Sequence, residues 1–253
     1  MGEPTRTARR RTPLRSTCAQ PHACPHPVRM QVLGRVPYLE GLSREQLEAI
    51  DARLVALSWA EGDPLYRAGE PAEHLFVLAS GRVKVTRSTA DGAQVITDLL
   101  VPGDLFGTVS TLGEPEHPET AEALTTVCAL RMDAATFRAV LAEHPGVALR
   151  VLDDVAARLA AARAGAVRAA GGTVEARVAG VLLRLADRLG QDRHDGGTLL
   201  QVPLSRADLA AMSGSTPESV SRVVSRWRRE GVVDAGRRWI AVVDRDRLAA
   251  LAG

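Results

Sequence analysis

Residues 204–233 restrict the possible folds most strongly, because their pattern is that of two helices joined by a tight turn. The hydroxyl of Ser205 can cap the first helix by satisfying one of its free backbone N–H groups. Gly214 supplies the turn, where a side chain would be unfavourable. A second helix then begins at Ser215 or Thr216. The stretch therefore predicts a compact pair of crossed helices.

The second helix of this pair has two different faces. Its inner stripe recurs every three or four residues: Val220, Val223, Val224 and Trp227. A glutamate, arginines and hydroxyls form the outer face, and these groups can hydrogen-bond to base edges and phosphates in the major groove. We therefore expect a helix-turn-helix whose second helix reads double-stranded DNA, although an ordinary charged hairpin is the alternative. The expected contact residues are Ser215, Thr216, Glu218, Ser219, Ser221, Arg222, Ser225 and Arg226.

Charge is unevenly distributed along the chain. Residues 1–29 hold six arginines and one acidic residue, and residues 201–253 hold nine arginines and six acidic residues, whereas residues 30–200 are net acidic. A basic end on an acidic body is typical of a nucleic-acid-binding module joined to a second domain. The chain has no long apolar run, no secretory signal and only three cysteines, so we expect a cytoplasmic protein.

The middle of the chain has the pattern of a β-roll. Short alternating runs (LFVLAS, RVKVTR, AQVITDLL and TTVCALRM) occupy residues 59–132, and turn residues such as Gly81 separate them. Strands of this length and spacing predict an antiparallel roll or sandwich. The preceding residues 37–57 have the spacing of short helices, with Ser43 as an N-cap.

A long alanine-rich helix is expected after the roll. Its narrow apolar seam favours pairing with its copy in a second subunit, and packing on its own domain is the alternative. Gly171-Gly172 then forms a hinge, Thr173 caps the next helix, and a loop over residues 192–197 leads to the two-helix unit. RRWIAVVD, near the end of the chain, predicts a two-stranded wing. The seam consists of Val147, Leu149, Leu152, Val155, Leu159, Ala162 and Ala166.

Over roughly residues 36–250, this order of segments resembles the CRP/FNR family of bacterial transcription regulators. The resemblance is carried by Gly69-Glu70 with LFVLASGRVKV, by VPGDLFG, by ALTTVCALRM and by STPESVSRVVSRW. It implies an α+β fold with an antiparallel β-roll like that of cyclic-nucleotide-binding proteins, a dimerisation helix and a winged helix-turn-helix. The expected parts are a disordered basic tail with two cysteines (1–35), the sensory roll (36–145), the dimerisation helix (146–170) and the DNA-binding domain (171–253). Translation from Met30 would remove most of the tail.

The resemblance also implies a homodimer that reads a two-fold symmetric DNA site and contacts RNA polymerase. Glu218 and Arg222 match the glutamate and arginine that read bases throughout the family. Ser221 matches a serine of the FNR branch, and Pro217 stands where the cyclic-AMP receptor branch has an arginine. We therefore expect an FNR-like half-site resembling TTGAT rather than TGTGA.

Cyclic AMP is not the expected effector. In the family, a glutamate after the VPGDLFG segment binds the ribose and an Arg-Ser pair in the next loop binds the phosphate. Here Thr108 follows Gly107, and the Arg-Ser positions align with His117-Pro118. The adenine-contacting pair falls on Ala162-Arg163. A pocket without a cation in the phosphate loop should bind a cyclic phosphate poorly.

The cysteines suggest a second kind of signal. FNR holds a [4Fe–4S] cluster with three N-terminal cysteines and one in the roll, and this chain has Cys18, Cys24 and Cys128. Only the C-x5-C part of the family spacing is present, so a fourth ligand would have to be His22, His26, an acidic residue or an exogenous group. A Zn²⁺ site, a redox dithiol and uninvolved thiols are the alternatives.

We therefore expect a dimeric DNA-binding regulator and not an enzyme. Its signal is either oxygen or redox state, sensed through an iron–sulfur cluster, or a small molecule in the roll; constitutive activity is a further alternative. A metal-dependent enzyme on the roll would need several ligands on adjacent strands, whereas the roll offers only His74 and His117. A ligand-binding module without DNA binding disagrees with the intact Glu218, Ser221 and Arg222.

Overall fold

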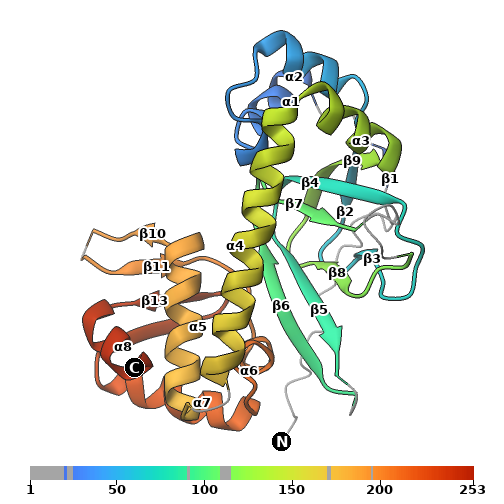
Figure 1. Ribbon diagram of the computed structural model, residues 1–253. Coiled ribbons are helices and arrows are strands. Elements are labelled where there is room, and N and C mark those ends of the chain that lie inside the picture. The colour runs from blue at the N-terminus through green and yellow to red at the C-terminus, as the bar shows by residue number, and fades with distance from the viewer. Residues whose placement is uncertain (1–19, 22–24, 90–91, 109–114, 170–171, 195) are drawn as a thin grey trace, which may run out of the picture.

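The computed structural model describes residues 20–21, 25–89, 92–108, 115–169, 172–194 and 196–253. A β-roll and a helical C-terminal domain lie on either side of the long helix α4 (Pro145–Ala169), as Figure 1 shows. Among the described residues, no helix is both long enough and apolar enough to cross a membrane.

Two antiparallel sheets make the roll, as the alternating runs predicted. Their facing side chains form one apolar core, which includes Trp59, Phe76 and Phe106. Gly81, between β4 and β5, has a φ of +89°, and a Cβ there would collide with the carbonyl of Thr126. The order is β1-β2-β9-β4-β7 in one sheet and β3-β8-β5-β6 in the other. The strands are β1 (Gln20–Pro21), β2 (Val55–Trp59), β3 (Pro64–Tyr66), β4 (His74–Ser80), β5 (Val83–Ser88), β6 (Gln94–Leu100), β7 (Leu105–Gly107), β8 (Thr120–Ala123) and β9 (Val127–Asp133).

Short helices cover the other face of the first sheet. The capping box predicted at Ser43 is present at the start of α2, with Gln46 as its partner. Leu33 and Ile50 lie in the core that these helices share with the sheet. The elements are α1 (His26–Leu33), the 3-10 helix η1 (Pro37–Leu39), α2 (Arg44–Asp51) and α3 (Ala134–Glu143).

The expected disorder of residues 1–35 is wrong for residues 26–33, which form α1. Two contacts hold this helix: Leu33 is fully buried, and the guanidinium of Arg29 donates two hydrogen bonds of 2.8 Å to the carboxylate of Asp51. The residues that contact Arg29 and Leu33 lie in other elements of the fold, so the composition of residues 26–33 did not reveal these contacts. Cys18, His22 and Cys24 lie outside the described residues.

The expectation of helix up to residue 57 is also wrong. Helix α2 ends at Asp51, and Val55–Trp59 form β2, which pairs antiparallel with β9. Leu57 and Trp59 are both buried between the two sheets, so their alternation is that of a strand. Leu54 continues the helical spacing of the apolar residues before it, so the sequence did not show the change from helix to strand.

Most of the large side chains of the α4 seam are exposed. Leu149, Leu152, Val155 and Leu159 are 51–64% exposed, whereas Val147 is buried in the core of its own domain. The seam prediction is therefore wrong at Val147, because the first turn of α4 still packs on the roll. The side chains of Ala162, Arg163 and Ala166 lie outside the described residues, as does Gly171 of the expected Gly171-Gly172 hinge.

The C-terminal domain combines four helices with one antiparallel sheet. The two strands expected within RRWIAVVD are wrong in their bounds, because that stretch holds only β13, which pairs with the preceding β12. The sheet is also larger, because β10 and β11 add to it and give the order β10-β11-β13-β12. Most of residues 192–197 form the connection between β10 and β11, as a loop there predicted. The elements are α5 (Val174–Leu189), β10 (Gln191–Asp192), β11 (Thr198–Leu200), α6 (Arg206–Ser213), α7 (Pro217–Arg229), β12 (Val233–Gly236), β13 (Trp239–Val242) and α8 (Arg245–Ala252).

The C-terminal domain packs directly on the roll. Leu99 and Leu124 of the roll belong to the same apolar cluster as the interior of the C-terminal domain. Beside them, Arg188 of α5 donates to Asp98 at 2.6 Å and to Asp104 at 2.5 Å. The contact between the domains is thus partly apolar and partly ionic.

Candidate nucleic-acid interface

The two helices and their turn have the caps that the sequence predicted. Ser205 accepts a hydrogen bond from the backbone N–H of Asp208, and the carboxylate of Asp208 accepts one from the N–H of Ser205. Gly214 ends α6 in the left-handed conformation, with φ +57°. Thr216 caps α7 by accepting from the N–H of Ser219. These local bonds fix where α7 begins.

The inner face of α7 anchors it in the domain. Val220, Val224 and Trp227 are fully buried, and Val223 is partly buried. The indole N–H of Trp227 donates to the carboxylate of Glu175 at 2.9 Å, so the one polar atom of this ring is also satisfied. The apolar stripe predicted from the sequence is confirmed.

The opposite face of α7 is open. Glu218, Arg222 and Ser225 are exposed and Ser221 is partly exposed, at spacings that place them on one side of the helix. Within the described part of the chain, no hydrogen bond or ion pair holds the side chains of Glu218 and Arg222. A carboxylate and a guanidinium, two groups that can hydrogen-bond to base edges, therefore lie on the same open side of α7.

The remaining predicted contact residues are committed to the domain itself. Arg226 forms an ion pair with Glu175 of α5. Ser215 accepts from Arg177, and the hydroxyls of Thr216 and Ser219 bond to each other. The expected set thus contains side chains without a bond to the described chain and side chains bonded within the motif, and DNA contact by either group stays a prediction.

Arg177 and Glu175, in the first two turns of α5, were missed by sequence reasoning. The guanidinium of Arg177 donates to the carbonyls of Ser213 at 2.7 Å, Gly172 at 2.6 Å and Gly214 at 3.2 Å. Glu175 binds both Trp227 and Arg226, and its pKa is lowered because these hydrogen bonds outweigh the opposing effect of burial. Their partners in α6 and α7 lie more than thirty-five residues away, so no local pattern could identify them.

Further arginines lie on α6, at the end of α7 and between β12 and β13. Arg206, in the first turn of α6, has a pKa lowered by burial and by the neighbouring Arg228. Arg228 also pairs with Asp234 at 3.4 Å, and Arg238 pairs with Glu61 of the roll at 3.0 and 3.1 Å. Arg229 and Arg237 are exposed.

Comparison with known proteins supports this geometry. Residues 56–144 match the cyclic nucleotide-binding domain family, and residues 176–251 match the Crp-like helix-turn-helix domain family. The cyclic AMP receptor protein of Thermus thermophilus is 30% identical over 200 residues, which cover 79% of this chain and 89% of that protein. This chain belongs to the CRP/FNR family.

Other members of the CRP/FNR family align over similar lengths. The CRP-like cAMP-activated global transcriptional regulator of Mycobacterium tuberculosis is 26% identical over 220 residues, which cover 87% of this chain and 97% of that protein. The structure of FixK2 from Bradyrhizobium japonicum superposes with a TM-score of 0.70 at 27% identity, covering 79% of this chain and 98% of that chain. The chain is thus a DNA-binding transcription regulator of the CRP/FNR type.

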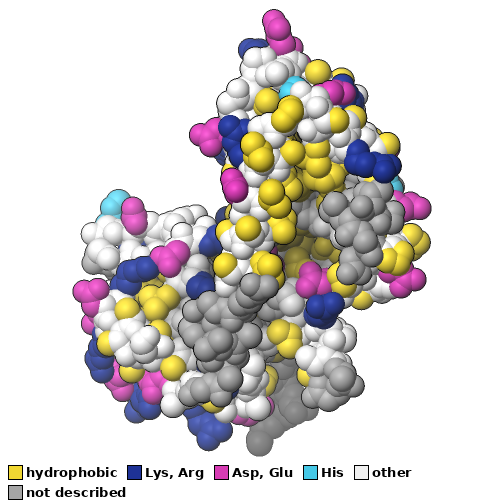
Figure 2. Space-filling view, in the orientation of Figure 1, with side chains coloured by type: hydrophobic (Ala, Val, Ile, Leu, Met, Phe, Trp, Pro, Cys, Tyr) yellow, Lys and Arg dark blue, Asp and Glu magenta, His cyan; other side chains and the backbone are white. Residues whose placement is uncertain are grey.

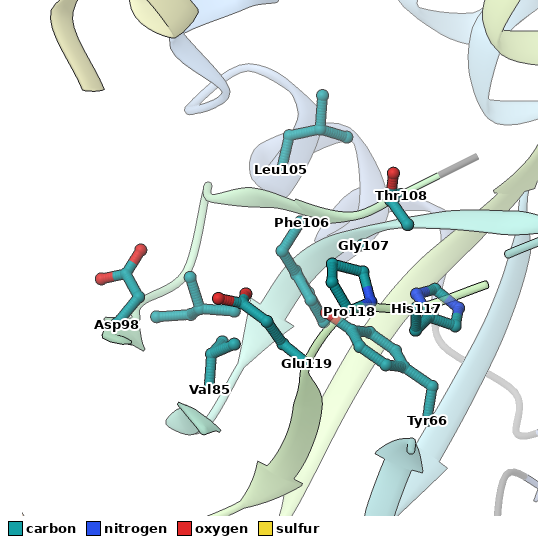
Figure 3. Close-up of a pocket in the computed structure, with 11 residues that line it drawn as sticks. Tyr66, Val85, Asp98, Leu105, Phe106, Gly107, Thr108, His117, Pro118 and Glu119 are labelled. Carbon is teal, nitrogen blue, oxygen red and sulfur yellow. The ribbon is translucent and has the colours of Figure 1, made fainter. Parts of the chain in front are cut away.

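The β-roll of this chain contains a cavity of about 170 Å³ between its two sheets (Figure 3). His117, at the position where the sequence comparison expects a phosphate-binding arginine, is buried and stacks on Tyr66 with ring centroids 3.9 Å apart. The described residues that line the cavity include no Lys or Arg, but they include two carboxylates. This set of side chains does not fit a cyclic phosphate. The lining residues are Tyr66, Val85, Asp98, Leu100, Leu105, Phe106, Gly107, Thr108, His117, Pro118 and Glu119.

Of the three cysteines, the described part of the chain contains Cys128, on β9. Its backbone is in register with Ser58 of β2, which in turn is in register with Gln20 of β1. No group of three or more potential metal ligands occurs among the described residues. Cys18 and Cys24 are outside this part, so the described residues do not assemble the predicted ligand set.

Proposed function

We propose that this CRP/FNR regulator binds a two-fold symmetric operator as a homodimer, with one α7 helix of each subunit in the major groove. The observation that carries the proposal is the open face of α7, where Glu218 and Arg222 are exposed and engaged in no bond to the described chain. Arg222 can fork onto a guanine, and Glu218 can accept from a cytosine amino group. RNA polymerase is a further partner that the family suggests.

The exposed seam of α4 supports the dimer. Figure 2 shows hydrophobic side chains running along this helix, and the exposed ones are Leu149, Leu152, Val155 and Leu159. They make up four of the seven large hydrophobic side chains exposed in the described chain. A copy of the same helix would bury them against an identical seam.

The proposed half-site is FNR-like and resembles TTGAT. Ser221 is partly exposed between Glu218 and Arg222, on the face that would meet the bases, and Pro217 occupies the first turn of α7. The preference for this half-site rests on the family resemblance of these residues. Electrophoretic shift assays with TTGAT-type and TGTGA-type palindromes test it directly. Tighter binding to the second type contradicts the proposed half-site, and failure to bind any palindrome contradicts the proposed dimeric reading.

DNA binding is proposed to respond to a signal in the roll, of one of two kinds. The first kind is a thiol-based sensor: Gln20, two residues after Cys18 in the sequence, belongs to the same sheet as Cys128, with β2 between their strands. A small molecule in the cavity of Figure 3 is the other kind.

Visible absorbance and iron content of the full-length protein, purified without oxygen, separate these signals. A broad band near roughly 400 nm with stoichiometric iron, bleached by air, supports a cluster on cysteine thiolates. A colourless, iron-free protein that still binds the operator contradicts the cluster and leaves the small-molecule signal and a metal-free thiol switch.

A further inference from the structure

The roll cavity contains a carboxylate with no counter-ion. Glu119 lies on the cavity wall, is partly buried, and takes part in no hydrogen bond or ion pair with the described chain. Figure 3 shows its carboxylate directed into the space between Asp98 and the ring of Phe106. Asp98 also lines the cavity, and burial, followed by the charges of Glu119 and Asp98, raises the pKa of Tyr66 beside them. The cavity is therefore electrostatically negative.

Nearby cations are already engaged elsewhere. Lys84 pairs with Glu122 at 2.9 Å, and Arg188 pairs with Asp98 from the C-terminal domain at 2.6 Å. Burial lowers the pKa of His117, so its imidazole is predominantly neutral at pH 7. Glu119 is thus left without a positive partner among the described side chains.

The other walls are aromatic and apolar. Tyr66, Phe106 and His117 are each less than 10% exposed and lie in one stack, with the ring centroids of Tyr66 and Phe106 6.4 Å apart. Nδ1 of His117 is a buried polar atom without a hydrogen-bond partner. A neutral imidazole can accept a hydrogen bond at one ring nitrogen. The site thus combines an apolar body with acceptors and a negative charge.

We propose that this cavity binds a small organic ammonium ion, with Glu119 as its counter-ion and the Tyr66–Phe106 stack against its apolar or aromatic part. A protonated amine supplies the donors and positive charge that the site lacks, and aromatic faces attract cations. The proposal rests on the small-molecule form of the proposed function. It differs from the anionic ligand implied by the cyclic nucleotide-binding domain family.

A ligand bound in this cavity affects the DNA-binding domain through Asp98. This residue lines the cavity and also accepts a hydrogen bond from Arg188 of α5. A second cation near Asp98 weakens its attraction for Arg188, because the two positive groups share one carboxylate. Ligand binding should therefore loosen the contact between α5 and the roll.

The test uses probe pairs that differ in the sign of their charge: tyramine against 4-hydroxyphenylacetate, and benzylamine against benzoate. Binding to the full-length protein is measured by calorimetry and by ligand-observed NMR. Wild-type protein should bind the ammonium member of each pair and not the carboxylate. Glu119→Gln should weaken ammonium binding about tenfold or more, since a charge-assisted hydrogen bond is lost.

Glu116→Gln is the matched control. Glu116 lies three residues before Glu119, is exposed and does not line the cavity, so this variant should bind like wild type. Three results overturn the proposal: the protein binds neither amine, it binds both members of a pair equally, or the two variants lose ammonium binding to the same extent. Operator binding is measured in the same preparations without a probe. A protein that binds operator but no ammonium refutes the ligand alone, whereas one that binds ammonium but no palindrome refutes the proposed operator reading alone.

Discussion

Replacing Leu152 with alanine should weaken the proposed dimer strongly. Leu152 is 62% exposed on α4. Full burial of a leucine side chain contributes about 1.5–3 kcal/mol, so burial of the exposed part at an interface contributes about 1–2 kcal/mol. A two-fold interface contains the residue twice, which gives about 2–4 kcal/mol per dimer. At about 1.4 kcal/mol per tenfold change, the dimer Kd should rise about 30- to 700-fold.

Analytical ultracentrifugation over a concentration series measures this Kd. Alanine is the strongest helix former, so Leu152→Ala should leave α4 intact, and circular dichroism checks that it does. Val55→Ala and Val243→Ala are the controls, because these valines are 41% and 44% exposed and lie outside α4. A Kd within twofold of wild type, or an equal change in either control, would refute the assignment of the seam as the interface.

Three further predictions concern the interior contacts. Glu175→Ala should lower the free energy of unfolding of the C-terminal domain by about 1–3 kcal/mol, because it leaves the buried indole N–H of Trp227 without a partner. Glu175→Gln should lower this free energy less. Urea titration followed by tryptophan fluorescence measures both effects. Arg188→Gln should speed amide hydrogen exchange about fivefold where α5 meets β6, which corresponds to a loss of about 1 kcal/mol in the free energy of opening. Arg245→Gln removes an ion pair within the C-terminal domain and should leave the exchange at this contact unchanged. Burial lowers the pKa of His117 from its ordinary 6.5, so the contribution of His117 to stability is complete above pH 6.5 and is lost as pH falls towards the folded-state pKa. Unfolding titrations at stepped pH should therefore show that the free energy of unfolding declines less steeply with falling pH in His117→Gln than in wild type. The same decline in both proteins contradicts this cause.

The helix-turn-helix was predictable because its limits depend on neighbouring residues. Ser205, Gly214 and Thr216 each act within a few positions of themselves, through a cap or a left-handed turn. The inner and outer faces of α7 followed from one periodicity. The same reasoning could not separate Arg226 from Arg222, since the ion pair of Arg226 with Glu175 depends on how α5 crosses α7.

The features that were missed depend on distant contacts. Helix α1 is anchored by Asp51, which lies twenty-two residues beyond Arg29. Val147 has the spacing of the exposed seam, but the roll covers it. The negative cavity joins Glu119 to Asp98 and Tyr66, which come from separate strands and connections. Only the folded arrangement of the two sheets brings these charges together.

Selection of binding sites from random double-stranded DNA, with the full-length protein and with Arg222→Ala, tests the central claim most directly. The wild-type protein should select a two-fold symmetric sequence with half-sites about one helical turn apart. Arg222→Ala should keep the symmetry and spacing but lose preference at one base pair of each half-site, at a cost of about 1–3 kcal/mol there. Selection of an asymmetric sequence, or the same base preference in Arg222→Ala as in wild type, would contradict base reading by α7 in a symmetric dimer.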